Sequence, residues 1–296
     1  MSAERAYRLK AGEPLPEGVV LIARGRIDHA IAELRGKSDS GAEEAVHEAR
    51  KDLKKLRALL RMTRGELGDD TFRRENSGFR DAARELSGVR DSDAMLDTLR
   101  TLELPAGIER ELRGTIEAHR ALGDSDGRDA AAAGVVAMLR EARERVDNWP
   151  LARDSFDALR DGLERTYRRG RRDFRTARTE PTVETLHEWR KRVKELWYHH
   201  TLLRALWPPV MQSVGDEAHE LANRLGDDHD LAMLAAWVRE HAEVEPEFFA
   251  TLEVRRSELQ GEAMVLGKRL YSDKPRAYVR RLRRLWDASQ ASVRAP

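Results

Sequence analysis

The stretch Ala45-Val46-His47-Glu48-Ala49-Arg50-Lys51-Asp52-Leu53-Lys54 organises the chain, because its pattern returns 140 residues later. The second copy reads Thr185-Leu186-His187-Glu188-Trp189-Arg190-Lys191-Arg192-Val193-Lys194. Both copies fit H-E-x-R-K-x-Φ-K, in which Φ is an aliphatic residue. A second pair of similar segments follows in the same order, at residues 89–96 and 226–234. Two repeated segments in one order predict an internal duplication with a unit of about half the chain.

Apolar residues around these stretches return at intervals of three and four, which is the period of amphipathic helices, and no alternating strand pattern is found. We expect helices over residues 18–35, 41–67, 70–103, 105–122, 127–148, 153–178, 181–206, 209–241, 246–271 and 275–290. Gly and Pro clusters mark the breaks between them. The prediction is an all-α protein with two pseudo-symmetric helical bundles around a basic central cleft or channel. Residues 1–296 form one domain, with halves at about 15–149 and 150–290.

Composition excludes several classes of protein. The chain has no cysteine, so it holds no disulfide, thiolate metal site or cysteine nucleophile, as is typical of a reducing cytosol. Its longest apolar run, residues 130–139, is far shorter than the roughly 20 residues of a membrane span. The N-terminal residues lack the apolar segment of a secretory signal. We therefore expect a cytoplasmic protein without a membrane partner.

The charges are numerous but segregated. The 296 residues include 54 Lys and Arg and 53 Asp and Glu, which leaves a net charge of +1. Residues 45–64 and 160–178 each carry a net charge of +5, whereas residues 215–230 carry −5. Such segregation presents a cationic surface on a nearly neutral protein, and it favours an anionic partner.

A helical wheel at 100° per residue gathers the cations of each copy into one stripe beside the apolar side. With Val46 at 0°, the first stripe, between about 20° and 100°, contains Arg57, Arg50, Arg61, Lys54 and His47. At the matching angles the second copy has His187, Arg190 and Lys194. The first stripe is about 21 Å long at 1.5 Å per residue, which is the length of a groove.

An ordinary solvated face is the simple alternative, but such a face alternates charge signs at i and i+4. These stripes stack like charges at that spacing, which destabilises an isolated helix and favours a bound anion as compensation. The preceding helix of each half adds Arg24 and Arg171 at corresponding positions. We therefore expect four helices to meet around the basic channel or cleft.

Catalytic and metal motifs are missing. The zinc motif H-E-x-x-H fails in both copies, because lysine occupies its fifth position. His229-Asp230 lacks the further His and Asp residues of metal phosphohydrolases. A structural role, pairing with Arg or Lys, is expected for the acids Asp91, Asp228 and Asp230. No phosphate-binding glycine loop or serine nucleophile motif is present, so we expect no catalytic residue, no metal site and no cofactor.

At the paired stripes the sequence resembles the CHAD family, which is named for its histidines on an α-helical domain. The resemblance runs from about residue 15 to Trp286. Its ordered elements are the stripe at His47, Arg90-Asp91, residues 167–172, the stripe at His187 and residues 225–230. It implies an all-helical, two-bundle fold that binds inorganic polyphosphate on a basic surface around the pseudo-two-fold axis, without hydrolysing it.

The resemblance also implies a set of phosphate contacts. On the two stripes these are His47, Arg50, Lys51, Lys54, Arg57, His187, Arg190, Lys191, Lys194 and Tyr198. Further contacts are expected from Arg24, Tyr167, Arg168, Arg171 and Arg172. The family often has an arginine before this tyrosine, where Trp197 stands here. A polyphosphate ligand would also place the protein at polyphosphate granules in the cytoplasm.

Other functions stay open. Nucleic acid is the second candidate ligand, but a single-strand binder needs aromatic platforms for its bases, and only Trp197 and Tyr198 offer them. A metal-dependent phosphohydrolase acting on polyphosphate needs a carboxylate metal cluster, which the sequence does not show. A helical scaffold for an acidic protein is the third alternative, with no particular partner indicated.

Overall fold

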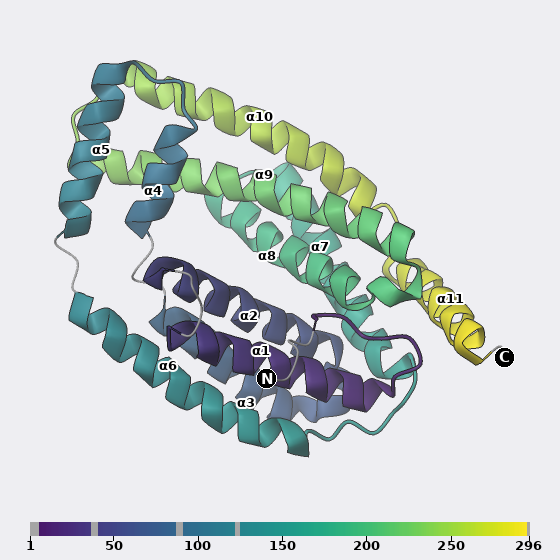
Figure 1. Cartoon of the computed structure of the whole chain (residues 1–296). Helices are drawn as coiled ribbons and strands as arrows, with labels where there is room; N and C mark the ends of the chain where they lie inside the picture. The colour runs from purple at the N-terminus through teal and green to yellow at the C-terminus, as the bar shows by residue number, and fades with distance from the viewer. Residues whose placement is uncertain (1–5, 37–40, 87–90, 122–124, 295–296) are drawn as a thin grey trace.

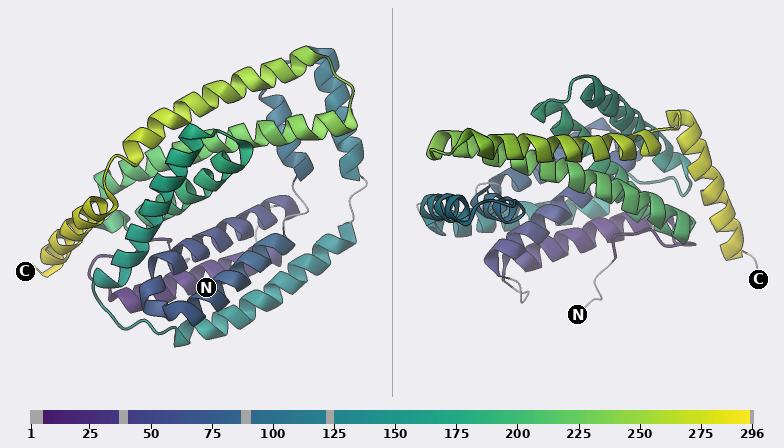
Figure 2. Two further views of the ribbon diagram at one scale, coloured as in Figure 1. Left: turned by 180° about the vertical axis from the view of Figure 1, so that it is seen from behind. Right: turned by 90° about the horizontal axis from the view of Figure 1, so that it is seen from above.

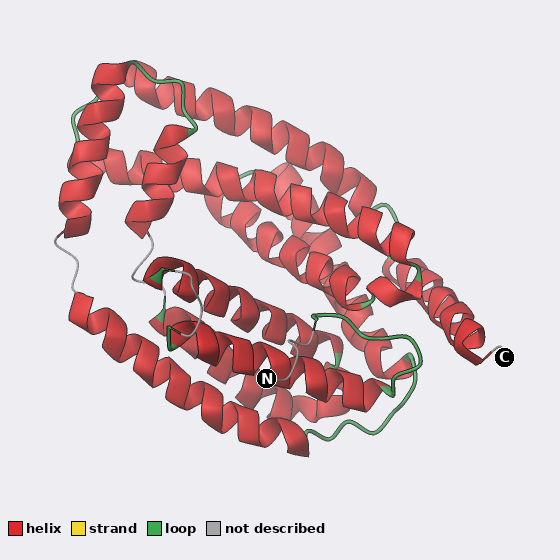
Figure 3. Cartoon of the chain, viewed as in Figure 1, coloured by secondary structure: helices red, strands yellow, loops and turns green. Residues whose placement is uncertain are grey.

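The computed structural model describes residues 6–36, 41–86, 91–121 and 125–294, and in these ranges the chain forms helices joined by turns and loops, without a strand (Figures 1 and 3). The α-helices are α1 (Leu15–Leu34), α2 (Ala42–Met62), α3 (Arg64–Glu85), α4 (Asp91–Arg100), α5 (Ala106–Ala121), α6 (Ser125–Arg145), α7 (Asp157–Thr179), α8 (Val183–Leu202), α9 (Pro208–His241), α10 (Pro246–Leu270) and α11 (Pro275–Arg294). Short 3₁₀ helices at Val146–Asn148 and Arg204–Leu206 follow α6 and α8. The predicted all-α fold class is confirmed.

Helix ends and breaks coincide with proline, glycine and capping residues in the sequence. Three helices, α9, α10 and α11, begin at a proline, which needs no hydrogen-bond partner there. Thr182 caps α8, because its hydroxyl accepts a hydrogen bond from the backbone N–H of Thr185. Gly68 breaks the regular course of α3 with a left-handed φ of 71°, a conformation that glycine adopts without a steric penalty.

Two predicted helices are wrong. The helix expected over 41–67 is interrupted, because α2 ends at Met62 and α3 begins at Arg64. Periodicity indicates a single helix over 70–103, but α3 ends at Glu85 and α4 begins at Asp91. The two helices pack against different partners: α3 contacts α2 and α6, whereas α4 contacts α5 and α9. A continuous helix could not reach both sets of neighbours, so tertiary packing overrides the local periodic signal.

Two groups of helices lie side by side and share an interface. In the first group α1, α2, α3 and α6 contact one another around a common interior. In the second group α8 packs on α7 and α9, and α10 packs on α9. Helix α7 joins the groups by contacting α2 and α3, and α2 also contacts α8 (Figure 2). Helix α11 packs on α7 and carries the C-terminal end away from the body (Figure 1).

The main hydrophobic core runs through both groups. It includes Ile22 and Leu53 from the first group and Tyr167 and Trp189 from the second, all buried. At Gly162 the backbone of α7 meets the C-terminal end of α2 so closely that an added Cβ would lie 2.1 Å from the carbonyl oxygen of Met62. Only glycine permits this approach, which ties the two groups together at one end of α2.

A second, smaller core lies at the far end of α9 and α10. Leu99 of α4 and Ile116 of α5 are buried there with Leu234 of α9 and Leu252 of α10. Figure 1 shows the α4–α5 hairpin standing at the end of these long helices, away from α1. Helices from the first half of the sequence therefore complete the packing of the second half.

A buried ion-pair network joins α1 to α2. Arg26 Nη1 lies 3.2 Å from Asp52 Oδ1, and Lys55 Nζ lies 3.1 Å from the same oxygen. The aspartate is fully buried, so these cations supply the pairing that a buried carboxylate needs.

Between α7 and α8 the charges at the positions that correspond to Asp52, Arg26 and Lys55 are reversed. Arg192 stands 140 residues after the buried aspartate of α2, and it contacts Glu195 Oε1 through Nη1 at 2.6 Å. Its Nε atom lies 3.4 Å from Asp173 Oδ2 of α7. An arginine between two acids thus replaces an acid between two cations at matching places on matching helices.

Among the described residues, none of the helices combines the length and the apolar character required to span a membrane.

Candidate functional site

The predicted cations of α2 form one face of that helix. The α2 basic face consists of His47, Arg50, Lys51, Lys54 and Arg57. All five are half-buried, whereas an ordinary solvated face would be exposed. The residues between them, such as Ala49 and Leu53, are fully buried in the main core. The stripe therefore borders the core, as the helical wheel predicts.

The α8 basic face consists of His187, Arg190, Lys191 and Lys194, and α9 covers part of it. The ring of His187 lies 4.5 Å from that of His229 on α9, centroid to centroid. The guanidinium of Arg190 rests on Gly226, where an added Cβ would lie 2.6 Å from Nη2. Because Gly226 has no side chain, α9 leaves room for this arginine.

His219 of α9 packs beside the α8 basic face. Burial and then the positive charge of Lys194 on α8 lower its pKa, whereas the acids Glu220 and Asp216 oppose that shift. The ring of Trp197 lies against the same imidazole in a tilted arrangement, with the ring centroids 4.1 Å apart. Helix α9 therefore covers the end of the α8 basic face.

His187 is neutral in the ligand-free protein. Burial, followed by the neighbouring His229 and Lys191, lowers the pKa of His187 to about 4. Its Nδ1 atom is buried and makes no hydrogen bond within the described part of the chain. A neutral imidazole with an unused ring nitrogen lies among cations, so an anion that enters this face would favour its protonation.

Each basic face also contains one acid at the same position. Glu48 accepts a hydrogen bond from Lys51 at 2.5 Å, and Glu188 accepts one from Lys191. Burial alone would raise the pKa of Glu48, but the hydrogen bond and charge of Lys51 outweigh it and lower the pKa. Two of the four predicted lysine contacts, Lys51 and Lys191, thus each pair with a neighbouring glutamate.

The two predicted tyrosines lie in the core. Tyr198 is 5% exposed and Tyr167 is 2% exposed. The ring of Tyr198 packs against Tyr7 and Trp197, and the hydroxyl of Tyr167 donates to the carbonyl oxygen of Leu270 at 2.9 Å. Burial raises the pKa of both hydroxyls, to about 12 for Tyr167. Neither side chain presents a surface to a ligand in this structure.

The remaining predicted contacts lie outside the two basic faces. Arg24 pairs with Asp147, Arg168 with Glu164 and Arg172 with Asp173. Arg171 Nε donates to the carbonyl oxygen of Tyr271 at 3.1 Å, at the junction of α10 and α11. The structure does not gather these four arginines at His219, and each holds a local partner.

Of the described acids after the basic faces, Asp228 is paired as expected, whereas Asp230 is not. Asp228 is buried and accepts hydrogen bonds from Arg256 Nε at 3.1 Å and Gln260 Nε2 at 2.8 Å, which confirms its structural role. No ion pair of Asp230 occurs within the described residues, although its charge acts on His229. Arg90 and the side chain of Asp91 lie outside the described residues.

One group with metal-ligand chemistry occurs in the described ranges. Glu44, His47 and Glu48, on one turn of α2, place ligand atoms within 4.8 Å of one another. Glu44 is exposed, and Glu48 is held by Lys51. Cations line this turn of the helix, so we assign no metal to it.

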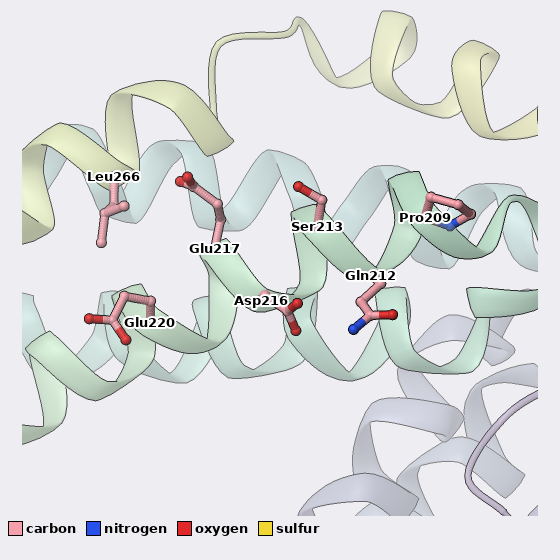
Figure 4. Close-up of a pocket in the computed structure, with 7 residues that line it drawn as sticks. All are labelled: Pro209, Gln212, Ser213, Asp216, Glu217, Glu220 and Leu266. Carbon is pink, nitrogen blue, oxygen red and sulfur yellow. The ribbon is translucent and has the colours of Figure 1, made fainter.

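A hollow of about 590 Å³ between α9 and α10 has the opposite character. Figure 4 shows its lining of Pro209, Gln212, Ser213, Asp216, Glu217, Glu220 and Leu266. The three acids make it unsuited to a polyanion. This hollow is therefore a different place from the two basic faces.

Comparison with known families gives one match. The family model described as CHAD domain matches residues 21–239, a range that includes both basic faces and His219. No curated protein matches the chain.

Proposed function

The chain belongs to the CHAD domain family, and we propose that it binds inorganic polyphosphate through the α2 and α8 basic faces. The observation that carries this proposal is the half-buried α2 basic face, on which five basic side chains share one side of a helix beside the core. Like charges at this helical spacing repel one another. A bound polyanion removes that repulsion and supplies charge-assisted hydrogen bonds in its stead.

The site chemistry supports polyphosphate over nucleic acid. Single-stranded nucleic acid binders use aromatic side chains on which bases stack. Tyr198 is buried, and Trp197 is stacked on Tyr198 and packed in a tilted arrangement against His219. The faces therefore offer cations without a free aromatic platform, which suits a ligand that has phosphates and no bases.

We also propose that the protein binds without catalysis. Phosphoanhydride cleavage needs a metal or base that prepares water and stabilises the leaving oxygen. The carboxylates near the faces are held by cations: Glu48 by Lys51, Glu188 by Lys191 and Asp228 by Arg256. A supporting role for these acids agrees with their pairing.

We infer that the two helix groups arose by internal duplication and surround the basic site. The charge-reversed networks at Asp52 and Arg192 support this inference. The aspartate sits between Arg26 and Lys55, and the arginine between Asp173 and Glu195. Reversal of all three charges keeps the two attractions between them, so matching positions in two copies of one unit can tolerate it.

A competition assay tests the proposed function. Long-chain polyphosphate, single-stranded DNA, double-stranded DNA and triphosphate are compared at one salt concentration, and we expect polyphosphate to bind most tightly. Charge-assisted hydrogen bonds contribute about 1.5–3 kcal/mol each, so Arg50→Ala with Arg190→Ala should weaken binding by at least about a hundredfold in total.

The matched control is Arg110→Ala with Arg113→Ala on α5, which removes the same charge outside the basic faces. Equal losses from both double variants would show that only net charge matters. Incubation of the wild type with polyphosphate and Mg²⁺ should release no orthophosphate above a blank. Release that disappears in Asp228→Asn would contradict binding without catalysis.

A further inference from the structure

A hollow of about 340 Å³ lies where residues 8–11 run beside the 3₁₀ helix Arg204–Leu206 and the start of α9. Its lining includes the cations Arg8, Lys10 and Arg204 and the apolar residues Leu9, Ala205 and Pro208. No acid occurs among the described residues that line it. The volume is near the lower end of the range of ligand sites. This hollow therefore combines an apolar wall with positive charge alone.

The wall of the hollow is fixed to the body of the protein. The backbone N–H of Leu9 donates to the carbonyl oxygen of Leu202, at the end of α8, over 2.9 Å. The hydroxyl of Tyr7 donates to the carbonyl oxygen of Lys55 on α2 at 2.8 Å. Both Tyr7 and Leu9 are buried in the main core. The hollow is thus a formed feature, because its N-terminal side is held by α2 and α8.

The three cations of the hollow are exposed, and their charge is not balanced by ion pairs. Arg8 and Lys10 form no ion pair within the described part of the chain. The guanidinium of Arg204 donates to the side-chain oxygen of Gln212, which is a neutral amide. The acids of the other hollow begin at Asp216, about 12 Å further along α9 than Pro208. An anion that approaches the cationic hollow therefore meets uncompensated positive charge.

Trp207 stands beside the hollow and is 51% exposed. It precedes Pro208 in the chain but is not one of the residues that line the hollow. An indole has an apolar body and a polar N–H, which suits the boundary between a membrane and water. A small ligand inside the hollow would leave Trp207 in water. A flat surface would cover both the indole and the cations.

Helix α11 adds further positive charge at the same end of the molecule. It contacts the 3₁₀ helix Arg204–Leu206, and Figure 1 shows it close to the start of α9. Arg276, Arg280 and Arg284 follow one another at four-residue spacing and are exposed. None of these three forms an ion pair within the described ranges, and at physiological salt such charges act over about 8 Å. They extend the attraction for an anionic surface.

We propose that the basic end, defined as Arg8, Lys10, Arg204 and Trp207, docks on a membrane surface rich in anionic phospholipid. Charge complementarity favours an anionic partner, and the apolar wall with the exposed indole favours one that also has an apolar part. Polyphosphate has no apolar part and would gain nothing from that wall. The contact is peripheral, so it requires no membrane-spanning helix. This inference does not rest on the proposed function.

Flotation with vesicles tests the cations. The wild type should bind vesicles of phosphatidylglycerol and phosphatidylcholine but not vesicles of phosphatidylcholine alone. Arg8→Ala, Lys10→Ala and Arg204→Ala together should lower binding about a hundredfold, because each cation at an anionic surface contributes about fivefold. Circular dichroism of each variant verifies that it is folded.

The matched control combines Arg100→Ala, Arg110→Ala and Arg255→Ala, which removes three exposed cations on α4, α5 and α10. Its binding should stay within about threefold of the wild type, since these charges lie outside the basic end. Equal losses in the two triple variants, or no binding of the wild type to anionic vesicles, would overturn the proposal.

Trp207 tests the orientation of the docked protein. Trp207→Ala should lower vesicle binding about fivefold, because the apolar part of the indole enters the membrane boundary. Met233→Ala is the control, since Met233 is 50% exposed on a later part of α9. Lipids with brominated chains should quench the fluorescence of the wild type but not that of Trp207→Phe. Equal quenching of both proteins would place another indole at the membrane and contradict this orientation.

Two soluble ligands separate membrane docking from other uses of the hollow. The polyphosphate affinity of the triple variant at Arg8, Lys10 and Arg204 should stay within about twofold of the wild type. A loss as large as that for vesicles would make the hollow part of the polyphosphate surface. Saturable binding of a peptide of alternating Glu and Phe, without binding to vesicles, would indicate a protein partner instead. Either result would overturn membrane docking, whereas failure of polyphosphate to bind the wild type would contradict only the proposed function.

Discussion

His187 illustrates how packing changes the charge of one side chain. Its sequence motif places it beside lysine and arginine, but α9 then covers it with His229, and burial is the largest cause of its lowered pKa. With a pKa of about 4 it is uncharged at neutral pH. It therefore adds no electrostatic repulsion to the neighbouring cations in the ligand-free protein. Its protonation is therefore available as a response to an anion.

Polyphosphate binding should take up a proton at His187. Phosphate raises the pKa of a neighbouring imidazole, so binding strengthens as pH falls through the bound-state pKa and levels off near the empty-site value of about 4. The dissociation constant, measured from pH 8 to 4.5, should fall with pH in the wild type and less in His187→Gln. His241→Gln, an exposed histidine at the end of α9, is the control. The same pH dependence in His187→Gln and wild type would make His187 a packing residue only.

The contact of α8 with α9 positions Arg190 by steric fit and not by an ion pair with α9. Arg190 rests on Gly226, so the width of the gap between these helices determines where its guanidinium lies. A glycine in a long helix lowers helix stability by about 1 kcal/mol relative to alanine. Glycine is nevertheless suited to position 226, because the methyl group of an alanine there would clash with Arg190.

Gly226→Ala should weaken polyphosphate binding without changing any charge. The added Cβ would lie 2.6 Å from Arg190 Nη2, and the flexible guanidinium would move away while the fold stays intact. A loss of about fivefold in affinity is expected, since one charge-assisted contact is only displaced. Gly134→Ala on α6 is the matched control, because an added Cβ there meets nothing within 4 Å. Unchanged affinity in Gly226→Ala would show that Arg190 does not contact the ligand.

At the scale of the whole molecule, charge is distributed unevenly although its sum is small. A net charge of +1 gives little long-range attraction for a polyanion. The α2 and α8 basic faces concentrate cations, whereas the hollow between α9 and α10 concentrates acids. Binding must therefore come from local contacts, whose number is measurable.

The salt dependence of polyphosphate binding should measure the number of ionic contacts. Each phosphate contact of a single-stranded polyanion contributes about 0.7 to the slope of log affinity against log salt. The two faces should thus give a slope of several units, and Arg50→Ala with Arg190→Ala should reduce it by about 1.4. A slope near zero in the wild type would exclude a surface of many ionic contacts.

Much of this structure is determined by the sequence alone. Apolar spacing of three and four is a local property, so helices such as α2 and α8 and the basic stripes on them follow from neighbours within one turn. Proline at Pro208, Pro246 and Pro275 marks helix starts for the same local reason. The repeated motif also identifies the family, since it depends on residue order and not on packing.

Only the tertiary structure decided which surfaces meet. The division of residues 70–103 into α3 and α4 depends on contacts with α6 and α9, which no local pattern contains. Tyr167 and Tyr198 are predicted to contact the ligand, but both side chains are buried in the core. The sequence does not distinguish these places, because a tyrosine ring is suited to a core as well as to a surface. The contacts of His187 with His229 and of Arg190 with Gly226 carry no local signal, because they depend on where α9 lies on α8. Contacts between distant segments depend on how whole helix faces fit together, and that fit covers part of the α8 basic face.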